Sequence, residues 1–338
     1  MAKCKLTLRI DGHPGSYQPG DTIRGTVTLH AVEDVTAKSV TLERLWRVGG
    51  WGNTEERAVG KDELASDVQV RAGEQRDFAF AVAAPDGPTT YAGTLVQLDQ
   101  FIRARADVPW TVDPKIEERY ELRPGGTALI GDRAPFTRVV HAARAWNRLR
   151  LVALAVAAVL LWATDFPGSL LWLAIAGVVI ALFGRNTIAA RKLGDIALSI
   201  GATRACPGDQ IPIHLEIRPP TSVTIDRVAA TVAGKESATR GSGSDRQTRT
   251  HELLSEETVL IDGGTMERGQ VFSADTVVTV PRTTALSWKG SSNSIAWTVA
   301  IRIVVPSWPD WGVTRELVLV PGQPSTIEPV ATAALSAG

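Results

Sequence analysis

Tyr17-Gln-Pro-Gly-Asp21 stands between two runs of alternating apolar residues, and a near copy of it, Cys206-Pro-Gly-Asp209, stands between two more. Alternation with a period of two is typical of β-strands with one buried face. Proline suits the second position of a tight turn, and glycine adopts the positive φ that such turns need. The alternating positions are Cys4, Leu6, Leu8, Ile10, Ile23, Gly25, Val27 and Leu29 in the first copy and Ile196, Leu198, Ile200, Ile211, Ile213, Leu215 and Ile217 in the second.

The similarity between the two halves continues downstream of these turns. Ala72-Gly-Glu-Gln75 precedes a strand pattern that ends before Pro85, and Arg268-Gly-Gln270 precedes one that ends before Pro281. The offset between equivalent residues grows from 188 to 196, and the glycine- and serine-rich loop 241–245 accounts for the longer middle of the second copy. A self-similar order of strands and turns indicates a duplicated structural unit.

The pattern predicts an all-β fold made of two tandem antiparallel, immunoglobulin-like β-sandwiches with an inserted α-helical hairpin. Short strands separated by Gly, Pro, Asp and Asn, with no long amphipathic helix inside either half, favour sandwiches over βαβ units. The expected segments are a first sandwich at 1–124, a linker with a basic amphipathic lead-in at 125–148, a hairpin at 149–184, a basic linker at 185–193, a second sandwich at 194–322 and a disordered tail at 323–338.

The ordered motifs resemble the arrestin fold, including the bacterial sporulation-control arrestin-like proteins. The resemblance rests on Tyr17-Gln-Pro-Gly-Asp21 followed by Ile23-Arg-Gly-Thr-Val27, then Gly73-Glu74, Pro85 and a tryptophan near the last strand. It covers about 3–122 well and about 194–320 more weakly. The resemblance implies binding and scaffolding rather than catalysis. The sequence departs from it at the join, where a strongly apolar insert replaces a short linker.

The insert contains two uncharged runs, 151–164 and 170–184, on either side of a turn at 165–169. With flanking residues the two helices have 18 and 19 residues, or about 27 to 28 Å at 1.5 Å per residue, which suits a thin bilayer. We therefore expect a transmembrane hairpin that contacts lipid. The alternative is a helical hairpin buried between the sandwiches.

Basic residues flank the hairpin on both sides, and tryptophans lie toward its turn. By the positive-inside rule, both ends then face the cytoplasm. No apolar export signal stands at the N-terminus, so the expected location is the inner (cytoplasmic) membrane, with both sandwiches in the cytoplasm. The lead-in either lies along anionic head groups or exposes a solvated helix face. The expected membrane-flanking residues are Arg144, Arg148, Arg150, Trp162, Trp172, Arg185, Arg191 and Lys192.

Charge and cysteine content exclude some classes of function. Lys and Arg together number 36, as do Asp and Glu, so no global positive field attracts nucleic acid. Cys4 and Cys206 stand far apart without a CxxC motif, which fits a reducing compartment and two small buried side chains rather than a disulfide.

No motif predicts an active site, a metal or a cofactor. His251-Glu252 lacks the second histidine of a zinc-protease helix, and His13, His30, His141 and His214 have no ligand spacing. The glycine-rich stretches 49–52 and 241–244 match no phosphate-binding loop. Trp46, Trp51, Trp308 and Trp311 are expected in the cores, with partner anchoring as the alternative.

The leading hypothesis is a membrane-anchored, arrestin-like scaffold that binds an unidentified protein partner at the cytoplasmic face. The alternative is a β-sandwich module, soluble or envelope-facing, that binds a carbohydrate or another small ligand and buries its helical hairpin. An enzyme assembled from dispersed residues ranks third, so the chain is expected to have no enzymatic activity.

Overall fold

The computed structural model describes residues 3–12, 15–110, 112–125, 135–141 and 186–327. These residues belong to two compact units. Unit 1 comprises Met1–Ala128, Lys235–Leu253 and Thr283–Ala296, and unit 2 comprises Leu129–Gly234, Leu254–Arg282 and Trp297–Gly338. The domain boundaries expected from the sequence stay predictions.

The first sandwich consists of two sheets. A three-stranded sheet has the order β1-β3-β6, and a second sheet has the order β2-β9-β8-β4-β5, with β7 paired to β8. Neighbouring strands are antiparallel except for β2 and β9, which pair in parallel through two residues. The strands are β1 Cys4–Ile10, β2 Ser16–Tyr17, β3 Thr22–Ala31, β4 Val35–Gly50, β5 Glu55–Val70, β6 Gln75–Ala83, β7 Tyr91–Ala92, β8 Val96–Asp107 and β9 Lys115–Leu122.

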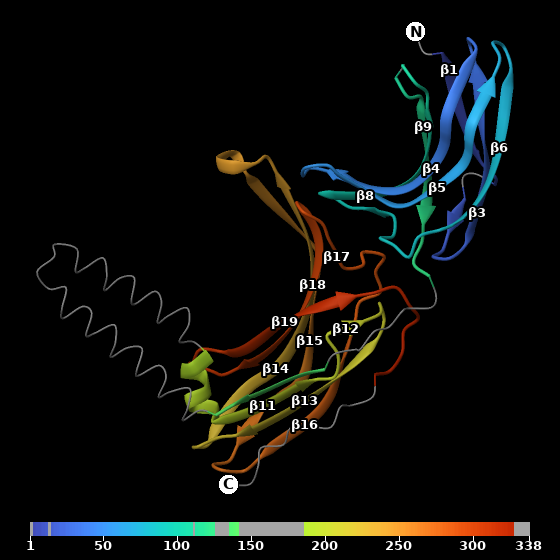
Figure 1. Cartoon of the computed structure of the whole chain (residues 1–338). Coiled ribbons are helices and arrows are strands. Elements are labelled where there is room, and N and C mark those ends of the chain that lie inside the picture. Colours follow the sequence, from blue (N-terminus) through green and yellow to red (C-terminus); the bar gives the residue numbers. More distant parts are fainter. Residues whose placement is uncertain (1–2, 13–14, 111, 126–134, 142–185, 328–338) are drawn as a thin grey trace, which may run out of the picture. The chain divides into compact units, whose positions relative to one another are not determined.

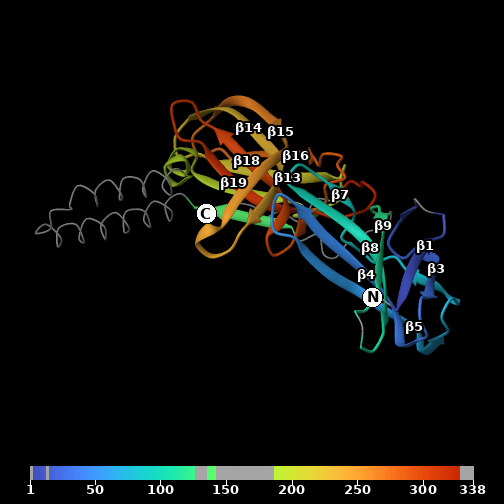
Figure 2. The same ribbon diagram turned by 90° about the horizontal axis from the view of Figure 1, so that it is seen from above.

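The second sandwich repeats this strand order. One sheet has the order β10-β11-β13-β16, and the other has the order β12-β19-β18-β14-β15, with β17 paired to β18. Both views show β18 beside β19 and β14 beside β15 (Figures 1 and 2). The strands are β10 Phe136–Val140, β11 Asp195–Ile200, β12 Arg204–Ala205, β13 Gln210–Arg218, β14 Val223–Arg240, β15 Gln247–Met266, β16 Phe272–Thr279, β17 Trp288–Lys289, β18 Asn293–Val304 and β19 Trp311–Leu319.

The Pro-Gly-Asp turns have the same geometry in both copies. Gly20 has a φ of +84° and Gly208 a φ of +89°, the left-handed region that glycine adopts without a steric penalty. Gly20 N donates to Ala84 O at 3.0 Å, and Gly208 N donates to Val280 O at 2.9 Å. The all-β structure and the repeated turns that the sequence predicts are therefore confirmed.

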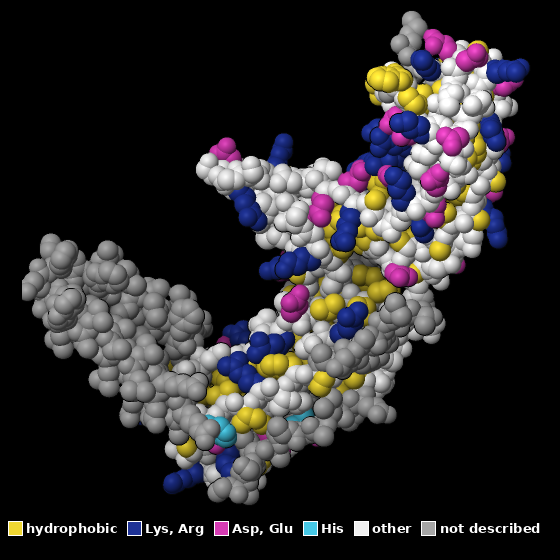
Figure 3. Space-filling model, viewed as in Figure 1, with side chains coloured by type: hydrophobic (Ala, Val, Ile, Leu, Met, Phe, Trp, Pro, Cys, Tyr) yellow, Lys and Arg dark blue, Asp and Glu magenta, His cyan; other side chains and the backbone are white. Residues whose placement is uncertain are grey.

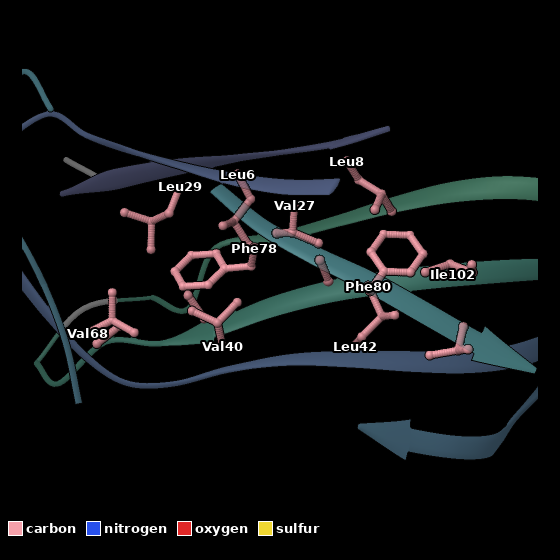
Figure 4. Close-up of a cluster of buried hydrophobic side chains, with 14 of the residues drawn as sticks. Leu6, Leu8, Val27, Leu29, Val40, Leu42, Val68, Phe78, Phe80 and Ile102 are labelled. Carbon is pink, nitrogen blue, oxygen red and sulfur yellow. The ribbon is translucent and has the colours of Figure 1, made fainter. Parts of the chain in front are cut away.

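The core of the first sandwich lies between its two sheets. Phe78 and Phe80 of β6 face Val40 and Leu42 of β4 across the sheets (Figure 4). Full burial of such a side chain contributes roughly 1.5 to 3 kcal/mol, so this layer is a major source of stability. Cys4 and Cys206 are buried and are not joined in a disulfide, as the sequence predicts.

The inserted α-helical hairpin of the predicted fold class is corrected. The described residues form an all-β structure, with only a helical segment at 186–193 and a 3-10 turn at Gly243–Asp245 besides the strands. No inserted hairpin is seen among them, and the predicted hairpin at 149–184 lies wholly outside the described residues. The prediction of a hairpin rested on the hydropathy of the two apolar runs, and hydropathy does not by itself specify which structure a segment forms.

The predicted inner-membrane location is corrected as well. Among the described residues, no helix combines the length and the apolar character that crossing a bilayer requires. The expected placement at the inner membrane is therefore corrected, and the hairpin on which it rested lies outside the described residues.

Candidate ligand-binding site

Three polar side chains from neighbouring strands form one row on the outer face of the β10-β11-β13-β16 sheet. Ser199 of β11 pairs with His214 of β13, and His214 pairs with Asp275 of β16. Residues directly opposite in an antiparallel pair point to the same face. The core side chains Ile213 and Leu215 flank His214 in sequence and point to the other face. The register therefore places a hydroxyl, an imidazole and a carboxylate side by side.

The imidazole of His214 lies between two carboxylates. Its Nδ1 atom is 2.7 Å from Asp275 Oδ1, and its Nε2 atom is 3.4 Å from Glu216 Oε1. The side chains of His214 and Glu216 are largely buried, whereas that of Asp275 is exposed. Contacts at both ring nitrogens fix the orientation of the ring, and the exposed carboxylate leaves acceptor capacity for a ligand.

This row lines a pocket of about 480 Å³. Such a volume lies within the range of small-molecule sites, which combine apolar walls with a few polar groups. A Cβ atom on Gly201 would lie 2.5 Å from Pro212 Cγ, so glycine permits the close contact between residues 201 and 212 in the pocket wall. The lining residues are Ser199, Gly201, Pro212, Ile213, His214, Asp275, Thr276, Val277, Thr326 and Ile327.

The segment 325–327 forms one wall of the pocket and is fixed to the start of β13. Asp209 Oδ1 accepts hydrogen bonds from Ser325 N at 2.6 Å and Ser325 Oγ at 3.3 Å. Gln210 N donates to Ser325 O at 3.1 Å, and Ile327 N donates to Gln210 O at 3.2 Å. These bonds hold Thr326 and Ile327 at the pocket edge.

The equivalent row of the first sandwich has a different chemistry. There the register places Arg9 of β1 opposite Thr26 of β3, and Thr26 opposite Ala79 of β6. The duplicated framework does not itself require a serine, a histidine and an aspartate, because the first copy folds without them. The row in the second sandwich is thus a feature of that copy alone.

A second polar cluster, on the first sandwich, consists of arginines and glutamates paired with one another. Arg103 bonds to Glu56 at 2.6 Å and to Glu117 at 2.7 Å, and Arg47 bonds to the same two carboxylates. Burial alone would raise the pKa of Glu56 and Glu117, but hydrogen bonds from the two guanidinium groups outweigh it and lower both pKa values. Basic and acidic side chains are interspersed over the visible face of this sandwich (Figure 3).

The structure brings few of the predicted site residues together. Arg191 is exposed and Lys192 is half-buried on the helical segment 186–193, where Lys192 Nζ is 5.9 Å from the ring of Trp308. The other predicted membrane-flanking residues, which are Arg144, Arg148, Arg150, Trp162, Trp172 and Arg185, lie outside the described residues. In the part of the chain that the structure describes, no group of three His, Cys, Asp or Glu side chains is placed to hold a metal ion.

The tryptophans divide between core and surface. Trp46 is buried with its ring 5.7 Å from that of Trp288 in an edge-to-face contact, and Trp311 is buried as well. Trp51 is half-buried beneath Arg249, and Trp308 is 41% exposed. The expectation of core positions is confirmed for Trp46 and Trp311 but is wrong for Trp308.

Sequence reasoning treated His214 as a scattered histidine and did not notice Ser199 or Asp275. The three residues are far apart in the chain, and only strand register brings them into a row. The signal that could have found them is the repeat itself. Alignment of the two copies places His214 at Thr26 and Asp275 at Ala79, so the second copy gains two ionisable groups at adjacent outward positions.

Comparisons with known proteins find likenesses among solved structures. No protein-family model matches the chain, and no curated protein matches it. Among solved structures it is similar to Spo0M, a sporulation control protein from Bacillus subtilis, with a TM-score of 0.33 and 13% identity over 64% of this chain and 80% of that one. At this distance the likeness assigns no family, ligand or partner.

Proposed function

We propose that this chain is a ligand-binding β-sandwich protein whose pocket on β11, β13 and β16 binds a small hydroxylated ligand of the size of a sugar unit. The observation that carries the proposal is the row Ser199, His214 and Asp275, which register places side by side at the floor of a pocket of about 480 Å³. Membrane anchoring forms no part of this function.

The polar groups of the pocket suit hydroxyl groups of a ligand. A hydroxyl both donates and accepts hydrogen bonds, and so do the Ser199 and Thr326 side chains, while a carboxylate such as Asp275 accepts only. A ligand with several hydroxyl groups satisfies all of these side chains at once. Because a polar group that a ligand buries without a hydrogen-bond partner is costly, the same pocket discriminates against apolar molecules of equal size.

The apolar part of the pocket suits the C–H faces of a ring. Pro212, Val277 and Ile327 lie among the lining residues, and Val277 is an exposed apolar side chain on a strand surface. Contact with a ligand ring removes this surface from water, at roughly 25 cal/mol per Å² of apolar area. Hydroxyl recognition on one side and apolar contact on the other together favour a carbohydrate.

We further propose that the row binds a ligand rather than catalysing hydrolysis. A serine nucleophile needs a base within hydrogen-bond reach. The contact that the structure gives to His214 Nε2 is Glu216 Oε1, at 3.4 Å, on the same strand. The imidazole nitrogen that would serve Ser199 is therefore turned toward a carboxylate, which supports a binding function for the row.

Calorimetric titration of the full chain with a panel of monosaccharides and disaccharides tests the proposal. We expect at least one saccharide to bind with a Kd below about 1 mM, which corresponds to roughly 4 kcal/mol of binding free energy. His214→Ala and Asp275→Asn should each weaken that binding at least about tenfold, since each removes a charged or imidazole hydrogen-bonding group.

The matched control is His30→Ala on β3, the equivalent strand of the first sandwich, where His30 contacts Thr7 Oγ1 at 3.5 Å. This variant should bind the saccharide as the unchanged protein does. The proposal is wrong if no saccharide in the panel binds, or if binding survives both pocket variants while their thermal unfolding matches that of the unchanged protein.

A further inference from the structure

The strand β16 forms one edge of the β10-β11-β13-β16 sheet and pairs with β13. Val280 N donates to Asp209 O at 2.8 Å, so the main-chain polar groups of Val280 point toward β13. These groups alternate in direction along an antiparallel ladder, so Val277 and every second residue along β16 point theirs away from β13. Within the described residues no other strand pairs with β16, and this row of N–H and C=O groups is open to one.

The other edge strands carry features that oppose pairing with a further strand. Proteins protect sheet edges with charged side chains, with very short strands, or by covering the outer polar groups. Charged side chains stand along β1, β5 and β15, and β2, β7, β10, β12 and β17 have only two to five residues. On β6, Arg44 Nη1 donates to the outward-facing oxygen of Ala83 at 2.8 Å. Each of these edges is therefore protected in one of the usual ways.

The sequence of β16 lacks this protection. Asp275 is its only charged residue, and the strand contains neither lysine nor proline. Valine, threonine and phenylalanine, which favour β-strands, make up more than half of it. Val277 is 47% exposed near the middle of the open edge. An exposed edge strand with little charge and a high preference for β-structure is expected to pair with another chain.

A second copy of β16 complements this edge across a two-fold axis. When the axis passes through Val277, Val277 faces Val277 of the second copy, and Asp275 faces Thr279 on both sides of the axis. All three residues point their main-chain polar groups outward, so each facing pair exchanges two hydrogen bonds, about six in total. The pairing also removes the exposed valine side chains from water and gives the carboxylate a hydroxyl neighbour.

The neighbouring registers are less favourable. An axis at Asp275 places two carboxylates directly opposite each other, and like charges in facing positions destabilise a strand pair. An axis at Thr276 places Val277 opposite Asp275, which leaves each valine beside a carboxylate instead of an apolar side chain. The side chains of β16 therefore select the axis at Val277. Because the strand complements itself in this register, a second copy of the chain is the partner that fits the edge.

We propose that two copies of this protein form a two-fold symmetric dimer through their β16 edges, with Val277 at the axis. The two β10-β11-β13-β16 sheets then join into one continuous antiparallel sheet. Asp275 and Val277 line the pocket of about 480 Å³, so the pockets of the two copies lie side by side across the axis. The dimer does not depend on what the pocket binds.

Sedimentation of the full chain at increasing protein concentration tests the dimer. The unchanged protein should pass from monomer to dimer. Val277→Lys places two ammonium groups opposite each other at the axis and should raise the Kd of the dimer at least about tenfold. The matched control is Val259→Lys, which changes a valine that is 49% exposed on β15 and should leave the Kd unchanged. Thermal unfolding shows that both variants are folded.

Cysteine cross-linking under mild oxidation tests the register. Val277→Cys should form a disulfide-linked dimer, since the Cα atoms of a facing pair lie about 5.5 Å apart, within reach of a disulfide. Asp275→Cys and Thr279→Cys should not link alone, because each lies four residues, or about 13 Å, from its own copy along the strands. Mixed together, these two variants should link. The unchanged protein, whose Cys4 and Cys206 are buried, gives the background.

Three results would each overturn the proposal. The first is a chain that sediments as a monomer at every concentration. The second is a folded Val277→Lys variant that dimerises as the unchanged protein does. The third is a Val277→Cys variant that forms no more linked dimer than the unchanged protein or than Asp275→Cys alone.

Discussion

Asp209 accepts a hydrogen bond from the main-chain nitrogen of Ser325, 116 residues away, at 2.6 Å. The carboxylate is fully buried, and its other oxygen accepts from Cys206 N at 2.8 Å. Its copy in the first turn, Asp21, accepts from Gln18 N at 2.7 Å and is exposed. The same turn residue thus closes a turn in both sandwiches and also fixes a pocket wall in the second.

Replacing Asp209 should therefore cost more than replacing Asp21. Asp209→Ala removes the acceptor of the N–H groups of Cys206 and Ser325, of which Cys206 is buried, and leaving a buried N–H unpaired costs roughly 1 to 3 kcal/mol. Asp21→Ala should cost about 1 kcal/mol, because water reaches its turn. Urea unfolding followed by circular dichroism measures both. Equal losses of unfolding free energy in the two variants would contradict the inference that Asp209 contributes more to stability than Asp21.

The two turn glycines offer a matched test of the pocket wall. A Cβ atom on Gly20 meets nothing within 4 Å, so Gly20→Ala should cost only the left-handed backbone penalty of roughly 1 to 2 kcal/mol. A Cβ atom on Gly208 lies 3.1 Å from Pro324 Cβ. Gly208→Ala should add a shift of the segment that leads to Ser325 and weaken saccharide binding, which Gly20→Ala should leave intact in calorimetric titration.

Glu236 should be among the carboxylates on which unit 1 depends most. Its fully buried side chain accepts from Tyr91 Oη at 2.5 Å and Leu95 N at 2.6 Å. Burial raises the pKa of Tyr91, and the hydrogen bond to Glu236 raises it further. Glu236→Ala removes the acceptor of the Tyr91 hydroxyl and of the Leu95 N–H, and it should destabilise the protein by about 2 to 5 kcal/mol.

A double-mutant cycle with Tyr91→Phe isolates the hydroxyl contact to Glu236. The coupling energy should be about 1 to 3 kcal/mol, in the range of contacting, hydrogen-bonded pairs. Glu63→Ala, at an exposed position of β5, serves as the control and should change stability by less than about 0.5 kcal/mol. A Glu236→Ala variant as stable as Glu63→Ala would refute the assignment.

The arginine-carboxylate cluster should make the stability of the first sandwich depend on pH in acid. The pKa values of Glu56 and Glu117 lie below their ordinary value of 4.5 in the folded protein. Groups with depressed pKa values stabilise the fold above the unfolded pKa, and this stabilisation is lost as pH falls through the folded pKa. Thermal unfolding measured between pH 7 and pH 3 should therefore show a fall in Tm that begins at about pH 4.5.

Substituting both carboxylates tests whether this cluster causes the loss. A Glu56→Gln, Glu117→Gln variant should be less stable at neutral pH and should change less between pH 7 and pH 3. A variant whose acid sensitivity matches that of the unchanged protein would show that other carboxylates cause the loss.

The contact between His214 Nε2 and Glu216 predicts the absence of esterase activity. Hydrolysis of 4-nitrophenyl acetate should proceed at the same rate with the unchanged protein and with Ser199→Ala, within about twofold, because no base is placed to activate the hydroxyl. A tenfold fall in rate for Ser199→Ala would instead show that Ser199 acts as a nucleophile.

The sequence by itself determined the duplicated β-sandwich fold, because its signals are local. Alternating side chains specify which face of a strand is buried, and Pro19-Gly20-Asp21 and Pro207-Gly208-Asp209 specify turns through φ values that neighbouring residues cannot alter. Burial of Cys4 followed from the same alternation. Hydropathy at 149–184 was less informative, because an apolar run indicates that a segment is unfavourable in water but does not indicate what the segment packs against.

Only the tertiary structure decided which polar side chains lie next to one another on the two sandwiches. Ser199, His214 and Asp275 become neighbours through strand register, and register depends on pairings between distant segments. Asp21 and Asp209 occupy the same turn position, yet Asp21 is exposed, whereas Asp209 is buried and bonded to Ser325. Register and burial are both properties of long-range contacts, so residues that look alike in the two repeats of the sequence have different surroundings in the folded protein.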